Sequence, residues 1–171
     1  IDEAMRRVPQ VYRECREAFT DIFGRDPGDV IQTFATEDAE LVLVASGTMA
    51  TTAREVVRQR RKAGERIGLV KVKMFRPFPG RAIREACQAA NRIGVLDRNY
   101  AAGSGGVFWQ DTRAAFQGRR DDVLIQNYLT GLCGGDVTPD VIDDILADLS
   151  SRYESCEPVW MGIEAGEETL Q

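Results

Sequence analysis

Short apolar segments alternate with longer segments of helical periodicity along most of the chain. Five segments have the β-branched, aliphatic or aromatic composition of strands: 30–34, 41–45, 67–75, 93–97 and 122–129. Helical patterns follow the last four of them: 49–63, 81–91, 107–117 and 139–153. Strands that alternate with helices at this spacing predict parallel β-α-β units, so we expect an α/β fold built as a three-layer α/β/α sandwich.

Residues 2–23 predict a further helix, ahead of the first strand. Its large apolar residues lie near one helical stripe: Met5, Val8, Tyr12, Phe19, Ile22 and Phe23. Pro9 falls inside this pattern, so the helix either starts or kinks there, and Gly24 is a suitable C-terminal stop. Because a lone solvated helix should not expose so much apolar surface, we expect it to pack outside the α/β core, against other protein.

Acidic residues outnumber basic residues by 27 to 22, and the net charge is −5. A protein that follows nucleic-acid phosphates needs a basic face, so this balance argues against a nucleic-acid partner. Apolar runs of membrane-spanning length are missing, and the first residues lack the apolar core of a signal peptide, which predicts a cytoplasmic protein. The acidic segment 157–171 has no periodic pattern, and we expect it to be irregular, either disordered or an arm against a partner.

Histidine is absent, and the cysteines are dispersed. Activation of a serine or cysteine nucleophile by histidine is therefore excluded, as are metal sites that contain histidine. The cysteines are Cys15, Cys87, Cys133 and Cys156, with no C-x-x-C pair among them. Since iron–sulfur and zinc sites need clustered thiolates, we expect neither in this chain, and we expect the thiols to be reduced and mostly buried.

The turn Ser46-Gly47-Thr48 joins a buried strand to a helix, which is how many nucleotide-binding folds begin. A helix N-terminus there offers N–H groups to an anion. However, the dinucleotide fingerprint G-x-G-x-x-G and the phosphate loop G-x-x-x-x-G-K-[ST] are both missing. A chain turn with a helix cap is therefore favoured over a phosphate site.

The best candidate site follows the predicted strand 93–97, where charged residues precede a glycine-rich stretch and a helix start. Its residues are Asp97, Arg98, Asn99, Gly103, Ser104, Gly105 and Gly106. The glycines allow close approach of a ligand or of another backbone, and a helix start gathers unpaired N–H groups. The alternative is an Asp97–Arg98 surface pair beside a mobile loop, and the sequence leaves both interpretations open.

Two further segments have structural interpretations. In the stretch 134–139, Asp136 or Thr138 is suited to cap the last helix. Lys71 and Lys73 alternate with apolar residues, as the outer face of a strand does, so a solvated or interfacial face is favoured there over an anion site.

Several segments together, in order and spacing, resemble the carboxyl-terminal part of the alpha subunit of 2-oxoacid:acceptor oxidoreductases, the group of pyruvate:ferredoxin oxidoreductase. They are ASGTMATTAREVV, VKMFRPFP, GVLDRN, GSGGVFW and GLCGGDVTP. The helix that ends in FGR, followed by TEDAELVLVASG, resembles the family's link between its first and second domains. The resemblance implies a linker helix at 1–28, a domain similar to the transketolase carboxyl-terminal domain at 29–151 and a tail at 152–171. It also implies a mixed five-stranded sheet in the order 1-3-2-4-5, with the first strand antiparallel.

The family decarboxylates a 2-oxoacid on thiamine diphosphate with Mg²⁺, passes electrons through [4Fe-4S] clusters to ferredoxin or a similar acceptor, and usually forms an acyl-CoA from coenzyme A. The diphosphate–magnesium motif and a cysteine-rich run are absent here, so the resemblance implies a structural and interface domain that binds none of these groups and carries no catalytic, cofactor or metal residue. The implied partners are a thiamine-diphosphate-binding beta subunit and a ferredoxin-like subunit. Alternatives are a stand-alone small-molecule or nucleotide-binding module and a domain of a transketolase-type or branched-chain dehydrogenase subunit.

In this family the edge of the sheet that carries the two candidate loops faces other domains. We therefore expect Ser46–Thr48, Asp97–Asn99 and Gly103–Gly106 to lie at an interface or near a ligand. Bulky replacements at Gly105 and Gly106 are expected to weaken assembly while the isolated domain stays folded.

Overall fold

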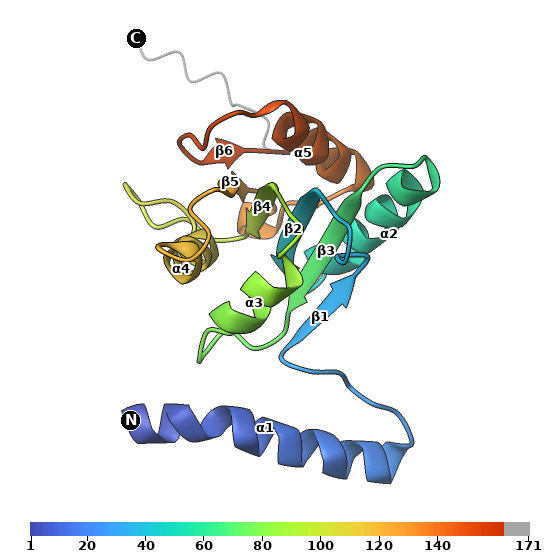
Figure 1. Ribbon diagram of the computed structural model, residues 1–171, viewed down its shortest axis with the longest axis vertical. Helices are drawn as coiled ribbons and strands as arrows, with labels where there is room; N and C mark the ends of the chain where they lie inside the picture. Colours follow the sequence, from blue (N-terminus) through green and yellow to red (C-terminus); the bar gives the residue numbers. More distant parts are fainter. Residues whose placement is uncertain (163–171) are drawn as a thin grey trace.

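The computed structural model describes residues 1–162 (Figure 1). Its strands are β1 (Ile31–Phe34), β2 (Leu41–Ser46), β3 (Ile67–Val72), β4 (Arg92–Asp97), β5 (Leu124–Leu129) and β6 (Val159–Trp160). Its helices are α1 (Asp2–Phe23), α2 (Met49–Lys62), α3 (Gly80–Ala86), α4 (Val107–Phe116), the 3₁₀ turn η1 (Leu132–Gly134) and α5 (Pro139–Ser151). All elements expected from the sequence are present, and most boundaries agree within a few residues.

The strands form one mixed sheet in the order β1-β3-β2-β4-β5-β6. β1 is antiparallel to β3, and the other neighbouring strands run parallel. The predicted order 1-3-2-4-5 and the antiparallel first strand are confirmed.

Alternate residues of the central strand β2 face two separate cores. Val42 and Val44 pack with α3 and α4 on one face of the sheet, whereas Leu43 and Ala45 pack with α2 and α5 on the other. An uninterrupted apolar run is needed to bury both faces of a strand, which explains the sequence LVLVA. The three-layer sandwich is therefore confirmed.

The connections that leave β2 and β4 diverge to opposite faces of the sheet. α2 follows β2 and lies in the layer with α5, whereas α4 follows β4 and lies in the layer with α3. Because β2 and β4 are neighbours, their carboxyl ends lie side by side while their helices separate. This is the topological switch point at which open α/β sheets form a crevice.

The segment after α5 departs from the expectation of an irregular tail, because part of it joins the sheet. Val159 and Trp160 form β6 and pair with Tyr128 and Leu129 of β5. A two-residue strand has no periodicity of its own, so the sequence pattern did not reveal it. The remainder of the predicted tail, 163–171, lies outside the described residues.

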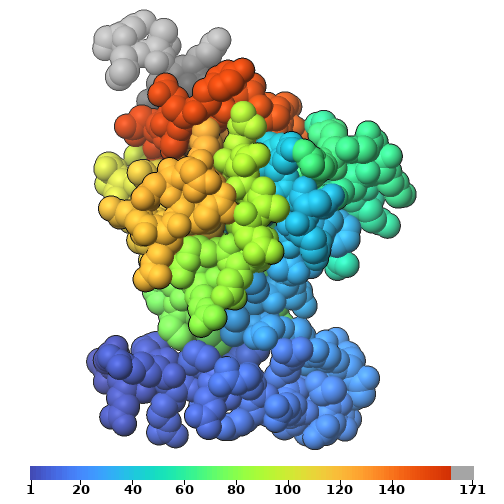
Figure 2. Space-filling view, in the orientation of Figure 1, coloured from blue at the N-terminus to red at the C-terminus, as the bar shows by residue number. Residues whose placement is uncertain are grey.

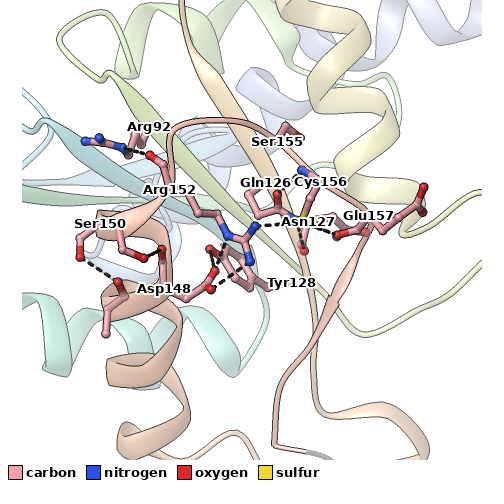
Figure 3. A network of polar contacts seen from close by, with 12 residues as sticks. Arg92, Gln126, Asn127, Tyr128, Asp148, Ser150, Arg152, Ser155, Cys156 and Glu157 are labelled. Carbon is pink, nitrogen blue, oxygen red and sulfur yellow. Dashed lines mark hydrogen bonds and ion pairs between the residues drawn. The ribbon is translucent and has the colours of Figure 1, made fainter.

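Polar side chains hold this returning segment in place (Figure 3). The Gln126 side chain donates to the carbonyl of Glu157 at 3.1 Å and accepts from the Cys156 amide at 2.9 Å. Arg152 forms an ion pair with Asp148, which also accepts a 2.6 Å hydrogen bond from the Tyr128 hydroxyl. Burial, followed by the Asp148 carboxylate, raises the pKa of Tyr128 far above its ordinary value, so the hydroxyl stays a donor. The segment is therefore fixed by side chains of β5 and α5.

Helix α1 lies apart from the sandwich (Figures 1 and 2). It runs through Pro9 as one helix and ends at Gly24, whose φ of +64° gives the expected left-handed stop. None of its residues is buried. Tyr12 reaches the chain after the helix, where its hydroxyl donates to the carbonyl of Gly28 at 3.0 Å, and Arg16 forms an ion pair with Asp26. The helix therefore lies outside the core, as expected; that it packs on other protein stays a prediction.

The cysteines correct one expectation. Cys87 is buried, and burial raises the pKa of its thiol to about 12. Cys15, Cys133 and Cys156 are exposed, so the thiols are not mostly buried. These three thiols lie on α1, in η1 and in the segment after α5, outside the two packed cores of the sandwich. As for membranes, none of the helices described is both long enough and apolar enough to cross one.

Candidate functional site

Asp97, the last residue of β4, organises the loop that follows it. Its side chain is fully buried. One carboxylate oxygen accepts from the Phe108 amide and the Asn99 side chain, both at 3.0 Å. The other accepts from the Trp109 amide at 3.0 Å and the Asn127 side chain at 2.9 Å. The carboxylate therefore caps the start of α4 with both oxygens.

The remaining amides at this helix start are also occupied. The Asn127 side-chain oxygen accepts from Gly106, and the Asn99 side-chain oxygen accepts from Val107, each at 2.9 Å. The start of α4 thus has partners within the chain, and the expectation of unpaired N–H groups at this position is wrong. The interpretation of Asp97 and Arg98 as a surface pair is also wrong, because Asp97 is buried and bonded elsewhere.

Burial raises the pKa of Asp97 to about 6 from an ordinary value near 3.8. The amides of Trp109 and Phe108 and the side chains of Asn127 and Asn99 lower the pKa, but they offset the cost of burial only in part. The charged form is therefore retained at neutral pH at some cost to folding.

Gly105 and Gly106 fit closely inside this corner of the fold. A Cβ atom at Gly106 would lie 2.1 Å from a carboxylate oxygen of Asp97. Gly105 has a φ of +91°, and a Cβ there would lie 3.0 Å from Pro158. Bulky replacements would thus damage the domain itself, which argues against the expectation that they spare its folding. Gly103 and Ser104, at the exposed tip of the loop, have no such constraint.

Arg98 connects three segments at the same edge of the sheet. Its guanidinium donates to the carbonyls of Gly131 at 3.1 Å and Gly135 at 3.0 Å, and to the Thr48 hydroxyl at 3.4 Å. Gly131 has a φ of +66°, and a Cβ there would lie 2.8 Å from the Arg98 side chain. Glycine at 131 therefore allows the guanidinium to pack against this loop. In the same loop, Thr138 caps α5 by accepting from the Val141 amide, as the sequence indicated.

A crevice of about 590 Å³ opens over the carboxyl ends of β2, β3 and β4. Its lining includes five of the candidate residues: Ser46, Gly47, Asp97, Arg98 and Asn99. Gly47 turns the chain there with a φ of +58°. Thr48 is linked to this group through Arg98, whereas Gly103 and Ser104 do not line the crevice.

Six lining residues are not among the sequence candidates: Lys71, Val72, Lys73, Phe75, Leu96 and Phe108. Lys71 and Lys73, interpreted as a solvated or interfacial face, line the crevice together with Phe75 and Phe108. Their alternation correctly indicated a strand, but it carried no information on which strand end would lie beside them. The order of parallel strands in the sheet, rather than any local motif, brings these residues to Ser46 and Arg98.

The chemistry of the available side chains does not fit the cofactors that the resemblance implies. A [4Fe-4S] cluster takes four thiolates, whereas the cysteines lie on α1, at the end of α3, in η1 and in the segment after α5. Magnesium diphosphate takes free carboxylate oxygens, but both oxygens of Asp97 are occupied by N–H donors. No catalytic step is therefore assigned to these residues through either group.

Comparison with known proteins gives matches of three kinds: curated relatives, a solved structure and a family model. Pyruvate synthase subunit PorA of Methanothermobacter thermautotrophicus is 34% identical over 165 residues, which are 96% of this chain and 41% of the relative. Ketoisovalerate oxidoreductase subunit VorA of Pyrococcus abyssi is 32% identical over 154 residues, or 90% of this chain and 38% of the relative. The chain thus spans about two fifths of the length of these curated relatives.

A solved structure shares the fold. It is a 2-oxoglutarate:ferredoxin oxidoreductase from Magnetococcus marinus with 2-oxoglutarate, coenzyme A and succinyl-CoA bound. The TM-score is 0.55 at 16% sequence identity, and the match covers 86% of this chain and 23% of the other. Finally, residues 39–142 match the family model described as pyruvate:ferredoxin oxidoreductase core domain II. The chain belongs to this domain family, found in subunits of 2-oxoacid:ferredoxin oxidoreductases.

Proposed function

We propose that this chain is a structural and interface domain of the alpha subunit of a cytoplasmic 2-oxoacid:acceptor oxidoreductase. The enzyme would oxidatively decarboxylate a 2-oxoacid, usually to an acyl-CoA, and pass the electrons to ferredoxin or a similar acceptor. The observation that carries this proposal is the 34% identity to a pyruvate synthase subunit over nearly the whole chain.

The cofactors of this reaction would lie in other parts of the enzyme. Thiamine diphosphate with Mg²⁺, [4Fe-4S] clusters and coenzyme A are implied by the family, and the side chains described above do not fit the first two. A thiamine-diphosphate-binding subunit and a ferredoxin-like subunit are the proposed partners. Residues 1–28 would link a preceding domain to the domain at 29–151, followed by the tail at 152–171.

The carboxyl edge of the sheet is suited to contact neighbouring domains. Ser46, Gly47 and Thr48 are exposed, as are the loop-tip residues Gly103 and Ser104. The hydrogen bonds of Asp97 and Arg98 hold the loops behind these surfaces within this chain. A surface that is already ordered loses little conformational entropy on binding, which favours its use as an interface.

A bulky residue at the loop tip tests this role. Ser104→Trp is introduced into the complete alpha subunit, which is co-expressed with the proposed partner subunits. Assembly is measured by size-exclusion chromatography, and 2-oxoacid-dependent dye reduction is measured alongside. We expect assembly to weaken at least about tenfold, because a large side chain in a fitted interface cannot be accommodated.

Ser150→Trp, on the exposed face of α5, provides the matched control. Each serine takes part in one local side-chain hydrogen bond, to Gln110 for Ser104 and to the Ala147 carbonyl for Ser150. Full assembly of the Ser104→Trp enzyme, or equal losses in both variants, would contradict an interface at this loop.

A further inference from the structure

The crevice at the switch point has the position and size of a small-ligand site. It lies over the carboxyl ends of neighbouring parallel strands whose helices leave on opposite faces of the sheet. In open α/β sheets, ligands bind in crevices at this position. Its volume of about 590 Å³ is within the usual range for small-molecule pockets.

Three cationic side chains from two strand ends line this crevice: Lys71, Lys73 and Arg98. Within residues 1–162, the Lys71 ammonium has neither a hydrogen bond nor an ion pair, although the side chain is half-buried. Lys73 donates to the carbonyl of Pro27, and Arg98 donates to two carbonyls and a hydroxyl. The partners of Arg98 are neutral, whereas Lys73 also lies over the Tyr12 ring and close to the Asp26 carboxylate, so its charge is directed to the loop after α1.

The one carboxylate in the lining does not neutralise these cations. Asp97 is buried, and its two oxygens are directed to the start of α4 and to the two asparagine side chains. Lys71 and Arg98 therefore line the crevice beside a single enclosed negative group. The Ser46 hydroxyl adds an exposed donor at the end of β2.

Two aromatic residues, Phe75 and Phe108, also line the crevice. Phe75 is 40% exposed and packs edge-to-face on Phe108, with ring centroids 5.9 Å apart. Phe78 contacts both rings at 6.0 Å, and the Arg76 guanidinium lies 4.1 Å from the Phe75 ring centroid. The Phe75 ring is thus held from three sides while part of its surface stays accessible.

We propose that this crevice binds a small organic phosphate. The phosphate oxygens would be held by Lys71, Arg98 and the Ser46 hydroxyl, and the organic part would pack on Phe75 and Phe108. Two cations and a hydroxyl donor suit a dianionic group with three acceptor oxygens better than a carboxylate with two. The crevice is complete within this chain, so the proposal goes beyond the assembly role and does not depend on it.

Phenyl phosphate is the probe that tests the site on the 171-residue chain, in a buffer free of phosphate. Titration is followed by calorimetry and by ¹H–¹⁵N spectra, which locate the contact. We expect a dissociation constant below about 1 mM, with the largest shifts at the amides of Gly47, Lys71 and Arg98. Inorganic phosphate and benzoate are expected to bind more weakly, because each lacks one half of the recognised ligand.

Lys71→Met removes the positive charge of Lys71 and keeps the length of the side chain. We expect affinity for phenyl phosphate to fall at least about tenfold, the usual effect of losing one charge-assisted contact. Lys62→Met, at the far end of α2, changes the net charge equally and is expected to bind normally. Phe75→Ala is expected to weaken phenyl phosphate while leaving inorganic phosphate unchanged. Thermal unfolding of each variant confirms that it is folded.

Several outcomes would overturn the proposal. They are absence of phenyl phosphate binding to the folded chain, unchanged binding by Lys71→Met, shifts confined to residues away from the crevice, and equal affinity for benzoate. Loss of assembly in the Ser104→Trp enzyme has no bearing on this result, so the two proposals fail separately.

Discussion

The α4 corner and helix α1 differ in how their side chains are accommodated. In the α4 corner, defined here as Asp97, Asn99, Gly106 and Asn127, buried polar groups find their partners within the chain. In α1, large apolar side chains such as Ile22, which is 74% exposed, remain in solvent. A buried polar group without a partner would destabilise the corner strongly. An exposed apolar stripe costs the fold less and is typical of a surface that contacts other protein. The corner therefore stabilises the domain from within, whereas α1 leaves an apolar stripe exposed.

The largest effect is expected from Gly106→Ala, which would place a methyl group against the Asp97 carboxylate. The backbone at 106 cannot move without breaking its 2.9 Å hydrogen bond to Asn127. We expect the free energy of unfolding to fall by about 3 kcal/mol or more, measured by urea denaturation. Gly103→Ala, where φ is also positive but no atom lies within 4 Å, is expected to cost only about 1 kcal/mol. Equal losses would show that close packing is not the reason for glycine at 106.

Asp97→Asn is expected to destabilise the domain by about 2–4 kcal/mol at neutral pH, although it removes a buried charge. An asparagine presents one oxygen and one NH₂ group, so the NH₂ group would face existing donors such as the Trp109 amide. Urea denaturation checks this value. A variant more stable than the natural chain would mean that burial of the charge outweighs all four hydrogen bonds.

The effect of Asp97→Asn on stability is also expected to depend on pH. Because the folded chain raises the pKa of Asp97 to about 6, its contribution to stability is fully present below about 3.8 and is lost as the pH rises through 6. Asparagine does not titrate, so the natural chain should lose about 2 kcal/mol relative to the variant between about pH 4.5 and about pH 7.5. A pH-independent difference would show that the pKa of Asp97 is not raised.

Arg98→Met tests the exposed neighbour of Asp97. Its guanidinium donates to the carbonyls of Gly131, which is buried, and of Gly135, which is exposed to water. We expect a loss of about 1 kcal/mol and faster amide hydrogen exchange in residues 131–136, with no change at α4. Faster exchange at α4 would show that the loops on either side of Arg98 act as one unit.

Ile22→Ser, on α1, is expected to change stability least, by less than about 0.5 kcal/mol, because the side chain is already exposed. Assembly of the complete alpha subunit with its partners, measured by size-exclusion chromatography, should nevertheless weaken. If the variant unfolds more easily, α1 belongs to the domain core; if assembly is unaffected, the stripe does not contact another surface.

The sequence predicts the local elements well and the contacts between them poorly. The run LVLVA identifies β2 because burial on both faces requires consecutive apolar residues. By contrast, Asp97 and Trp109 are twelve positions apart, and their hydrogen bond follows from the way the loop folds back on β4. Lys71 and Arg98 meet at one crevice only because β3 and β4 flank β2. Pairings of this kind depend on strand order, which no single motif records.

The segment after α5 also covers the outer edge of β5. A bare strand edge carries rows of unpaired N–H and C=O groups that can recruit the strand of another molecule. Here the Ser155 hydroxyl donates to the carbonyl of Ile125, the Met161 amide donates to the carbonyl of Leu129, and Gln126 binds the backbone on either side of Cys156–Glu157. The segment that returns beside β5 thus shields the edge from self-association, and a chain cut after α5 would be expected to aggregate through it.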